Sequence, residues 1–190
     1  MKKYRLQVFI FWLLFTSGVM SIYGIFYLAS IGYFGEMPDF RQLENPKTNF
    51  ASEIVSSDNQ ILGKYYFNDN RTPVDYDEIN PETVNALIAT EDERFFEHSG
   101  IDVRALGRVF VGVVSGNLKG GGSTITQQLA KLLFPRKRLS KFEFALRKIK
   151  EWIIATKLER NYTKEEILAM YLNKFDFLNN AVGINSAAQV

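Results

Sequence analysis

The sequence predicts a mainly α-helical domain with a small β element near its start, preceded by one membrane-spanning helix. Three observations predict this class: an almost uncharged apolar run over residues 6–34, two short strand-like runs after it, and helix-start signals from Asn80 onwards. At 190 residues, of which 46% are hydrophobic, the chain has room for a membrane segment and one compact domain.

Charge and cysteine content limit the chemistry without naming a partner. The chain carries 23 basic and 21 acidic residues, so its net charge of +2 indicates no partner by itself. It contains no cysteine, which excludes disulfides, thiolate metal sites and a cysteine nucleophile. His98 is the single histidine, so a histidine metal cluster is excluded as well.

The apolar run predicts a transmembrane helix over residues 6–34, after a cytoplasmic tail of residues 1–5. It exceeds the roughly 20 residues that cross a bilayer. A cleaved signal peptide, the alternative, has a shorter apolar centre and a small-residue cleavage site. Basic residues precede the run whereas Glu36 and Asp39 follow it, so the positive-inside rule places the rest of the chain outside the cytoplasm. No ATP or NAD pool is expected there, so energy-requiring chemistry needs a substrate that arrives activated.

Residues 35–49 are expected to form a linker, because they contain two prolines among polar residues and show no clear period. The domain itself is expected over residues 50–190. It begins with two strand-like runs, Glu53–Ser56 and Ile61–Phe67, which an Asp-Asn turn is expected to join in a hairpin.

A helix start at Asn80 leads to the first candidate for chemistry, Glu91. Asn80 can cap the helix, and the proline after it suits the first helical position. An apolar stripe then passes through Val84 and Ile88, and Glu91 is the next position on it. Partial burial and the negative end of the helix would both disfavour the charged carboxylate, which makes Glu91 the candidate general base. The alternative is that residues 91–94 form a solvated helix end.

The second candidate element is the glycine-rich loop at residues 120–123. Its three glycines allow the backbone to approach a ligand closely, and Thr124 with Gln127 has capping-box spacing, so a helix is expected to start there. Free N–H groups at that end favour phosphate or pyrophosphate, and one helix face carries Thr124, Gln127, Gln128 and Lys131. The loop is not a P-loop, because the Gly-Lys-Ser/Thr ending is missing. A plain flexible connection is the alternative.

A block of basic residues follows that helix. A capping box at Ser140 and Glu143 predicts the next helix start, and on this helix Arg147, Lys148 and Glu151 are expected to line one side. A charge run is usually a solvated face. Beside a bilayer, however, the partners at hand are anionic headgroups or a lipid-linked phosphate. Nucleic acid is not an expected partner outside the cytoplasm.

The last long helix is expected to start at a second capping box, formed by Thr163 and Glu166, after a stop at Asn161. One of its faces is apolar at helical spacing and is interpreted as plain core, with no chemical role. The residues of this face are Ile167, Leu168, Tyr171 and Leu172.

Four short motifs stand in a fixed order along the chain. The first is Glu91-Asp92-x-x-Phe95-x-x-His98-x-Gly100, and the second runs from Gly121 to Gln128 with Lys131 after it. The third is Arg147-Lys148-x-x-Glu151, and the fourth runs from Ile167 to Asn173. Together they resemble the motifs of the peptidoglycan glycosyltransferases, family 51, as found in class A penicillin-binding proteins. The resemblance covers the chain from about Asn49 to its end.

The resemblance implies a lysozyme-like fold and the polymerisation of lipid II into glycan strands at the membrane, together with cell wall synthesis partners. It implies that Glu91 deprotonates the acceptor's 4-hydroxyl, which attacks the donor's anomeric carbon with inversion as lipid pyrophosphate leaves. Lys131, Arg147 and Lys148 would stabilise the leaving charge. Glu151 would help to hold the leaving group or an associated divalent cation, Mg²⁺ or Mn²⁺, although no cofactor is required by the sequence.

The remaining motif residues receive roles from their motif positions. Substrate contact or support is implied for Asp92, Ser123, Thr124, Gln127 and Gln128. A structural role is implied for Phe95, His98, Gly100, Gly121, Gly122 and Asn173.

The sequence departs from the family pattern at three places. Glu143 stands where an arginine is usual, and either Arg136 or Arg138 is expected to take that role. Leu178 and Asn180 stand where glycines are common, so the local turn is expected to differ. The chain also stops inside an expected helix, which indicates a fragment of a longer enzyme and leaves the specificity of a transpeptidase domain open.

Two other functions stay open. A membrane-anchored, lysozyme-like glycan hydrolase would use the same pair of carboxylates, but it leaves the glycine-rich loop and the basic face without a task. A non-catalytic glycan- or partner-binding module would need neither carboxylate.

Overall fold

The computed structural model describes residues 2–37, 52–65, 73–117, 120–134, 138–177 and 181–189. The chain divides into two compact units. Unit 1 comprises Met1–Met37 and Arg138–Ile153, and unit 2 comprises Pro38–Lys137 and Ile154–Val190.

The first helix of unit 1, α1 (Lys2–Ser30), is long and apolar enough to cross a membrane. Its span Tyr4–Ser30 has a mean hydropathy of 1.9. The helix stops four residues before the expected end at residue 34, and residues 31–34 form turns in which Gly32 has a φ of 81°. The expected linker at residues 35–49 lies mostly outside the described residues.

The other element of unit 1 is the N-terminal part of helix α6 (Lys141–Asn161). The predicted capping box is confirmed, because Ser140 N–H donates to Glu143 Oε2 at 2.8 Å and Glu143 N–H donates to Ser140 Oγ at 3.3 Å. Two contacts tie this helix to α1 and to the turns that follow it. Lys150 Nζ donates to the carbonyls of Phe34 and Gly35 at 3.0 and 2.9 Å, and Trp152 stacks on Phe26.

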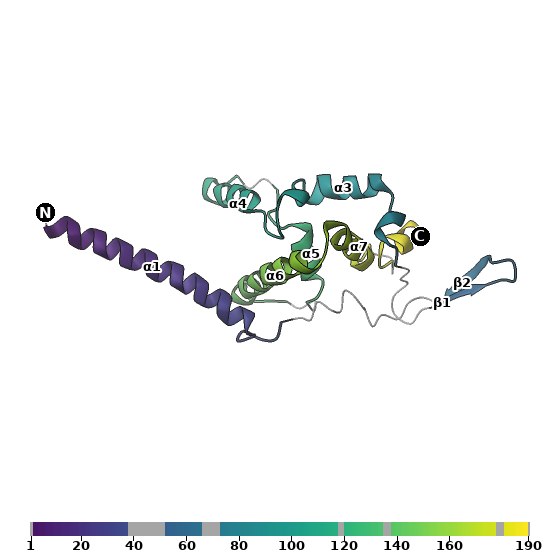
Figure 1. Ribbon diagram of the computed structural model, residues 1–190, viewed down its shortest axis with the longest axis horizontal. Helices are drawn as coiled ribbons and strands as arrows, with labels where there is room; N and C mark the ends of the chain where they lie inside the picture. Colours follow the sequence, from purple (N-terminus) through teal and green to yellow (C-terminus); the bar gives the residue numbers. More distant parts are fainter. Residues whose placement is uncertain are drawn as a thin grey trace. The chain divides into compact units, whose positions relative to one another are not determined.

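Unit 2 begins with the predicted β-hairpin (Figure 1). Strands β1 (Ser52–Val55) and β2 (Ile61–Tyr65) pair antiparallel, with Ser52 opposite Tyr65. Asn59 has a φ of 60° in the turn, a conformation that asparagine tolerates better than most residues. The last two residues of the second predicted strand lie outside the described residues.

The helices of unit 2 start where their capping signals predict. Asn80 accepts from Glu82 N–H at the start of α3 (Pro81–Glu91), and Thr163 with Glu166 caps α7 (Lys164–Lys174). Thr124 accepts from Gln127 N–H at the start of α5 (Ile125–Lys131). The other helices among the described residues of this unit are η1 (Tyr76–Glu78), η2 (Phe95–Glu97), α4 (Val103–Ser115) and α8 (Ile184–Ala188).

The core of unit 2 forms around α5, which packs against α7 (Figure 1). Ile125 and Leu129 of α5 are fully buried, as are Ile167 and Leu168 of α7. Phe95 is buried too, so its structural role is supported. The core therefore holds the C-terminal end of the first motif, the second motif and the fourth motif together.

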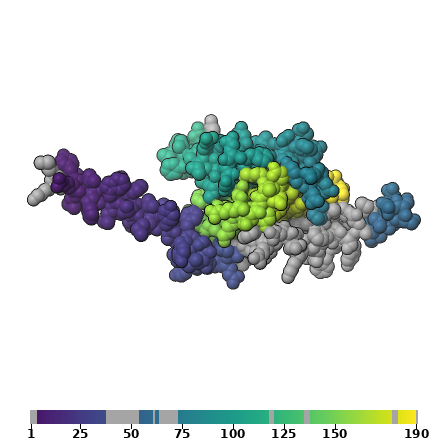
Figure 2. Space-filling view, viewed as in Figure 1, coloured from purple at the N-terminus to yellow at the C-terminus, as the bar shows by residue number. Residues whose placement is uncertain are grey.

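Helix α4 was not predicted individually. It lies on the visible surface of unit 2 (teal in Figure 2). Asp102 caps it by accepting from Ala105 N–H at 2.9 Å, and Gly116 ends it in the left-handed region. Its exposed apolar side chains include Val103, Phe110, Val111, Val113 and Val114.

Candidate active site

Glu91 is the last residue of α3, and its side chain is exposed. The predicted partial burial of Glu91 is therefore wrong. The reason is that α3 ends here: the chain turns at Asp92, whose φ and ψ are −159° and 71°, and Asp92 rather than Glu91 turns into the interior. Glu91 Oε2 accepts a hydrogen bond from Gln128 Nε2 at 2.8 Å, which joins the first motif to the second.

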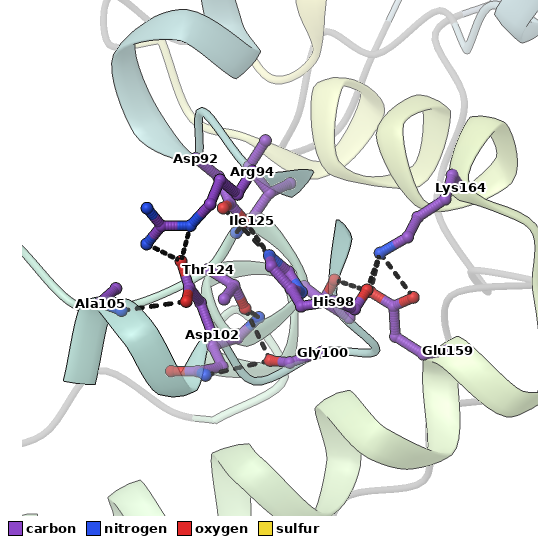
Figure 3. A network of polar contacts seen from close by, with 12 residues as sticks. Asp92, Arg94, His98, Gly100, Asp102, Ala105, Thr124, Ile125, Glu159 and Lys164 are labelled. Atoms are coloured by element: carbon purple, nitrogen blue, oxygen red, sulfur yellow. Dashed lines mark hydrogen bonds and ion pairs between the residues drawn. The ribbon is translucent and has the colours of Figure 1, made fainter. Parts of the chain in front are cut away.

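Asp92 lies in a polar network inside unit 2 (Figure 3). Its carboxylate is buried and contacts His98 Nε2 at 3.0 Å, and it accepts from the backbone N–H of Ile125, also at 3.0 Å. The predicted structural role of His98 is supported by this contact. Asp92 thus supplies the negative charge at the N-terminus of α5.

The α5 N-terminus is not a free anion site. Asp92 accepts a hydrogen bond from the Ile125 N–H, and Thr124 Oγ1 accepts one from the Gln127 N–H at 3.2 Å. The expectation that these N–H groups point freely into the loop is therefore wrong. The Thr124 hydroxyl and the Gln127 side-chain amide both donate to the carbonyl of Gly100, at 2.8 and 3.0 Å, and both residues are 1% exposed. These bonds favour the supporting role over substrate contact for Thr124 and Gln127.

A cavity of about 300 Å³ opens beside Glu91. Glu91 and Gln128 lie on its wall together with the glycine-rich loop, including Ser123. Adding a Cβ at Gly122 would bring it within 3.0 Å of the Val109 side chain, so glycine suits the close packing of this loop on α4. The cavity wall also includes Asp92, Glu93, Arg94, Asp102, Arg108, Gly120, Gly121 and Thr124.

Four charged residues of this wall, Glu93, Arg94, Asp102 and Arg108, were not predicted as site residues. Arg94 Nη2 forms an ion pair with Asp102 Oδ2 at 2.6 Å, and Arg108 Nη2 donates to the carbonyl of Gly121 at 3.2 Å. Asp102 could have been found from the sequence as a helix N-cap, because aspartate is favoured at that position. Ala105, whose N–H donates to it, stands three residues later. Arg108 carries no comparable signal, since its contact lies 13 residues away in the chain.

The third motif lies in unit 1, on α6. Glu151 is 2% exposed, and its two carboxylate oxygens contact Arg147 Nε at 3.3 Å and Lys148 Nζ at 2.7 Å. The prediction that these three residues line one side of the helix is confirmed. Arg138 is exposed, whereas Arg136 lies outside the described residues.

The acidic residues do not fit a metal held by protein ligands alone. Within the described residues, no group of three or more histidine and acidic side chains is placed to hold a metal ion. Both oxygens of Glu151 already contact cationic groups.

The fourth motif contributes two long-range polar contacts. Asn173 pairs with the backbone of Val74, donating to its carbonyl at 2.8 Å and accepting from its N–H at 3.0 Å, which supports its structural role. Tyr171 is 3% exposed, as its core assignment predicts, but its hydroxyl also donates to Gln128 Oε1 at 3.2 Å. The assignment of Tyr171 as plain core is therefore incomplete.

Comparison with known proteins agrees with these motifs. Residues 58–190 match the model of a protein family described as Transglycosylase. The chain belongs to this transglycosylase family. The expected fold class, a mainly helical lysozyme-like domain with a small β element, is thereby confirmed.

This transglycosylase chain is also similar to named penicillin-binding proteins. It is 41% identical to penicillin-binding protein 1A of Escherichia coli over 175 residues, or 91% of the chain. It is 44% identical to penicillin-binding protein 1F of Bacillus subtilis over 139 residues, or 73% of the chain. It covers 19% of each of these relatives, so it spans about a fifth of their length.

Proposed function

We propose that this chain carries the peptidoglycan glycosyltransferase site of a bacterial cell wall enzyme, which polymerises lipid II into glycan strands. Membership of the transglycosylase family and similarity to penicillin-binding proteins support this proposal. The observation that carries it is the placement of Glu91, an exposed carboxylate on a cavity wall, held by Gln128 at 2.8 Å beside the glycine-rich loop.

In the proposed reaction, Glu91 accepts the proton of the acceptor's 4-hydroxyl. The freed oxygen lone pair forms a bond to the anomeric carbon of the donor, while the bond from that carbon to the lipid pyrophosphate breaks and its electrons leave with the pyrophosphate. Attack from the side opposite the leaving group inverts the anomeric configuration. A positioned general base of this kind contributes roughly 10² to 10⁴ in rate.

The cations of the second and third motifs, namely Lys131, Arg147 and Lys148, are proposed from their motif positions to stabilise the leaving pyrophosphate. Arg138, which precedes the third motif in the sequence, is proposed to contribute. Glu151 would hold two of these cations in place through the ion pairs described above. Charge-assisted hydrogen bonds from such cations are stronger than those between neutral groups. A divalent cation, Mg²⁺ or Mn²⁺, would have to take most of its ligands from the pyrophosphate and from water.

We also propose that α1 anchors the chain in the cytoplasmic membrane, with its N-terminus inside and the transglycosylase domain outside. The length and apolar character of α1 and the basic residues before it support this orientation. A lipid-linked donor and membrane lipid would then lie at the same surface. The exposed apolar side chains of α4 suit contact with acyl chains.

The proposal is tested by incubating the chain, in detergent, with fluorescently labelled lipid II and separately with finished glycan strands. Polymer formation from lipid II alone would support glycosyl transfer. Shortening of finished strands, with lipid II left intact, would replace the proposal with a hydrolase. Binding of strands without either reaction would replace it with a glycan-binding module.

A further inference from the structure

A chain of hydrogen bonds crosses three helices of unit 2 and ends at Glu91. The Tyr171 hydroxyl on α7 lies 3.2 Å from Gln128 Oε1 on α5, and Gln128 Nε2 lies 2.8 Å from Glu91 Oε2 at the end of α3. The residues of these two bonds are 43 and 37 positions apart in the sequence, so the fold alone brings them together.

The direction of each bond follows from which groups can donate. A carboxylate only accepts, and a side-chain amide has one accepting end and one donating end. Because the Glu91 carboxylate can only accept, the amide nitrogen of Gln128 faces it, and the amide oxygen is left to accept from the Tyr171 hydroxyl. With the amide reversed, two oxygen acceptors would face each other and the bond to Glu91 would be lost.

The Tyr171 hydroxyl keeps its proton throughout the neutral range. Burial, and secondarily the negative charge of Glu91, raise the pKa of Tyr171 to about 12. The hydroxyl is therefore available as a donor at any pH at which an enzyme of this class would work.

Tyr171 is also fixed in space, whereas Glu91 is not fixed by packing. Tyr171 is 3% exposed, and its ring lies 5.3 Å from that of Phe175. Glu91 is exposed, so its long side chain would otherwise sample several rotamers. Gln128 lies between them and is half-buried.

We propose that Tyr171 is a positioning residue for the candidate base: through the Gln128 amide, it holds the Glu91 carboxylate in one orientation on the cavity wall. The carboxylate then accepts the hydroxyl proton with little reorganisation. This inference rests on the proposed function, because it assigns Tyr171 to the same site. Tyr171 thus has a positioning role in the site, whereas its sequence pattern places it in the core.

The first test is Tyr171→Phe, which keeps the buried ring and removes the hydroxyl. We expect kcat for lipid II polymerisation to fall about tenfold while KM stays within about twofold, because a misplaced base affects the transition state more than substrate binding. Tyr76→Phe, which removes a half-buried hydroxyl outside this chain of bonds, should match the parent.

A double-mutant cycle separates positioning from a structural role. If Tyr171 acts through the amide, Tyr171→Phe should cost little further activity in a Gln128→Ala background. An equal loss in both backgrounds would overturn the inference, as would an unchanged kcat in Tyr171→Phe alone. Circular dichroism of each variant verifies that the fold is retained.

An NMR measurement tests the same bonds without activity. In protein labelled at the tyrosine ζ-carbon, the Tyr171 signal is the one that Tyr171→Phe removes, and it should shift in Gln128→Ala because its hydroxyl loses its acceptor. If the parent does not polymerise lipid II but this shift occurs, the proposed function fails while the hydrogen bond from Tyr171 to Gln128 stands. No shift would overturn the positioning itself.

Discussion

Two carboxylates that are neighbours in the sequence have opposite environments. Glu91 is exposed on the cavity wall, whereas Asp92 is 8% exposed and contacts His98 and the Ile125 N–H. The end of α3 produces this difference, because the backbone leaves the helical conformation between the two residues. Glu91 is thereby left accessible on the cavity wall, whereas Asp92 is tied into the interior.

Asp102 is a third carboxylate, and its charge contributes to stability in acid. Burial by itself raises the pKa of this carboxyl, but the Ala105 N–H and the Arg94 guanidinium outweigh burial and hold the pKa below its usual 3.8. The folded state therefore releases this proton at lower pH than the unfolded chain does. The resulting stabilisation is fully present above the unfolded value and is lost as the pH falls through the lower, folded value.

Asp102→Asn keeps an N-cap side chain but removes the charge that pairs with Arg94. We expect the free energy of unfolding at pH 7 to fall by about 1–2 kcal/mol. Denaturant unfolding followed by circular dichroism measures the difference from the parent, which should shrink below about pH 4. A difference that stays constant down to pH 3 would show that the charge is not the cause.

A substitution at Gly100 tests how the first motif packs against α6. Its φ of 86° is strained for any residue with a side chain, and an added Cβ would lie 3.0 Å from the Ala155 carbonyl carbon and oxygen. Gly100→Ala should therefore lower the free energy of unfolding by about 2 kcal/mol or more. Gly107→Ala, where a Cβ meets open space within a helix, is the matched control and should be neutral or mildly stabilising. Equal stability of the two variants would contradict this packing.

At the scale of elements, α5 is the element that the other helices of unit 2 hold from several sides. The Ile125 N–H at its N-terminus donates to Asp92, and its Thr126 hydroxyl donates to Glu159 on α6. Its Gln128 side chain forms hydrogen bonds with both Glu91 and Tyr171. The capping signal predicts where α5 begins. It does not predict which groups its polar side chains contact, because those groups come from distant parts of the chain.

A polar contact at the start of α7 links α7 to α6 and to the first motif (Figure 3). Lys164 Nζ donates to Glu159 at 2.9 Å and to the His98 carbonyl at 2.7 Å, and it lies 4.2 Å above the Phe95 ring. The Glu159 side chain is 5% exposed, so its charge depends on these partners.

Lys164→Met should lower the free energy of unfolding by about 3–5 kcal/mol, because it leaves the buried Glu159 carboxylate without its cation. Adding Glu159→Gln to Lys164→Met should restore much of this loss, since the buried charge is then gone. Urea unfolding of the single and double variants measures both effects. A double variant as unstable as the single one would show that lost packing, and not the buried charge, causes the damage.

For the whole molecule, local signals predict local structure well. Residues near one another in the chain account for the hairpin and the apolar helix. They also account for the starts of three helices, at Asn80, Ser140 and Thr163. The contacts of Gln128 with Glu91 and Tyr171 depend on how distant helices pack, which periodicity and capping do not encode. The motif resemblance identified Glu91 and Gln128, but not the bond between them.

The orientation of the whole chain in the membrane can be measured directly, because the sequence contains no cysteine. A single cysteine introduced by Ser57→Cys lies in the exposed turn of the hairpin. In intact spheroplasts we expect this thiol to react with a membrane-impermeant maleimide. A cysteine introduced by Lys3→Cys should react only after the membrane is permeabilised. The reverse pattern would refute an extracytoplasmic domain.

The central claim is that Glu91 is the base of a glycosyl transfer, and one comparison tests it most directly. Initial rates of lipid II polymerisation are measured in detergent for the parent, for Glu91→Gln and for Glu82→Gln, which removes an exposed carboxylate from the first turn of the same helix. We expect Glu91→Gln to lose at least about 100-fold in rate while keeping the parent's circular dichroism spectrum, and Glu82→Gln to stay near the parent. A folded Glu91→Gln protein that polymerises lipid II at the parent's rate would contradict the account.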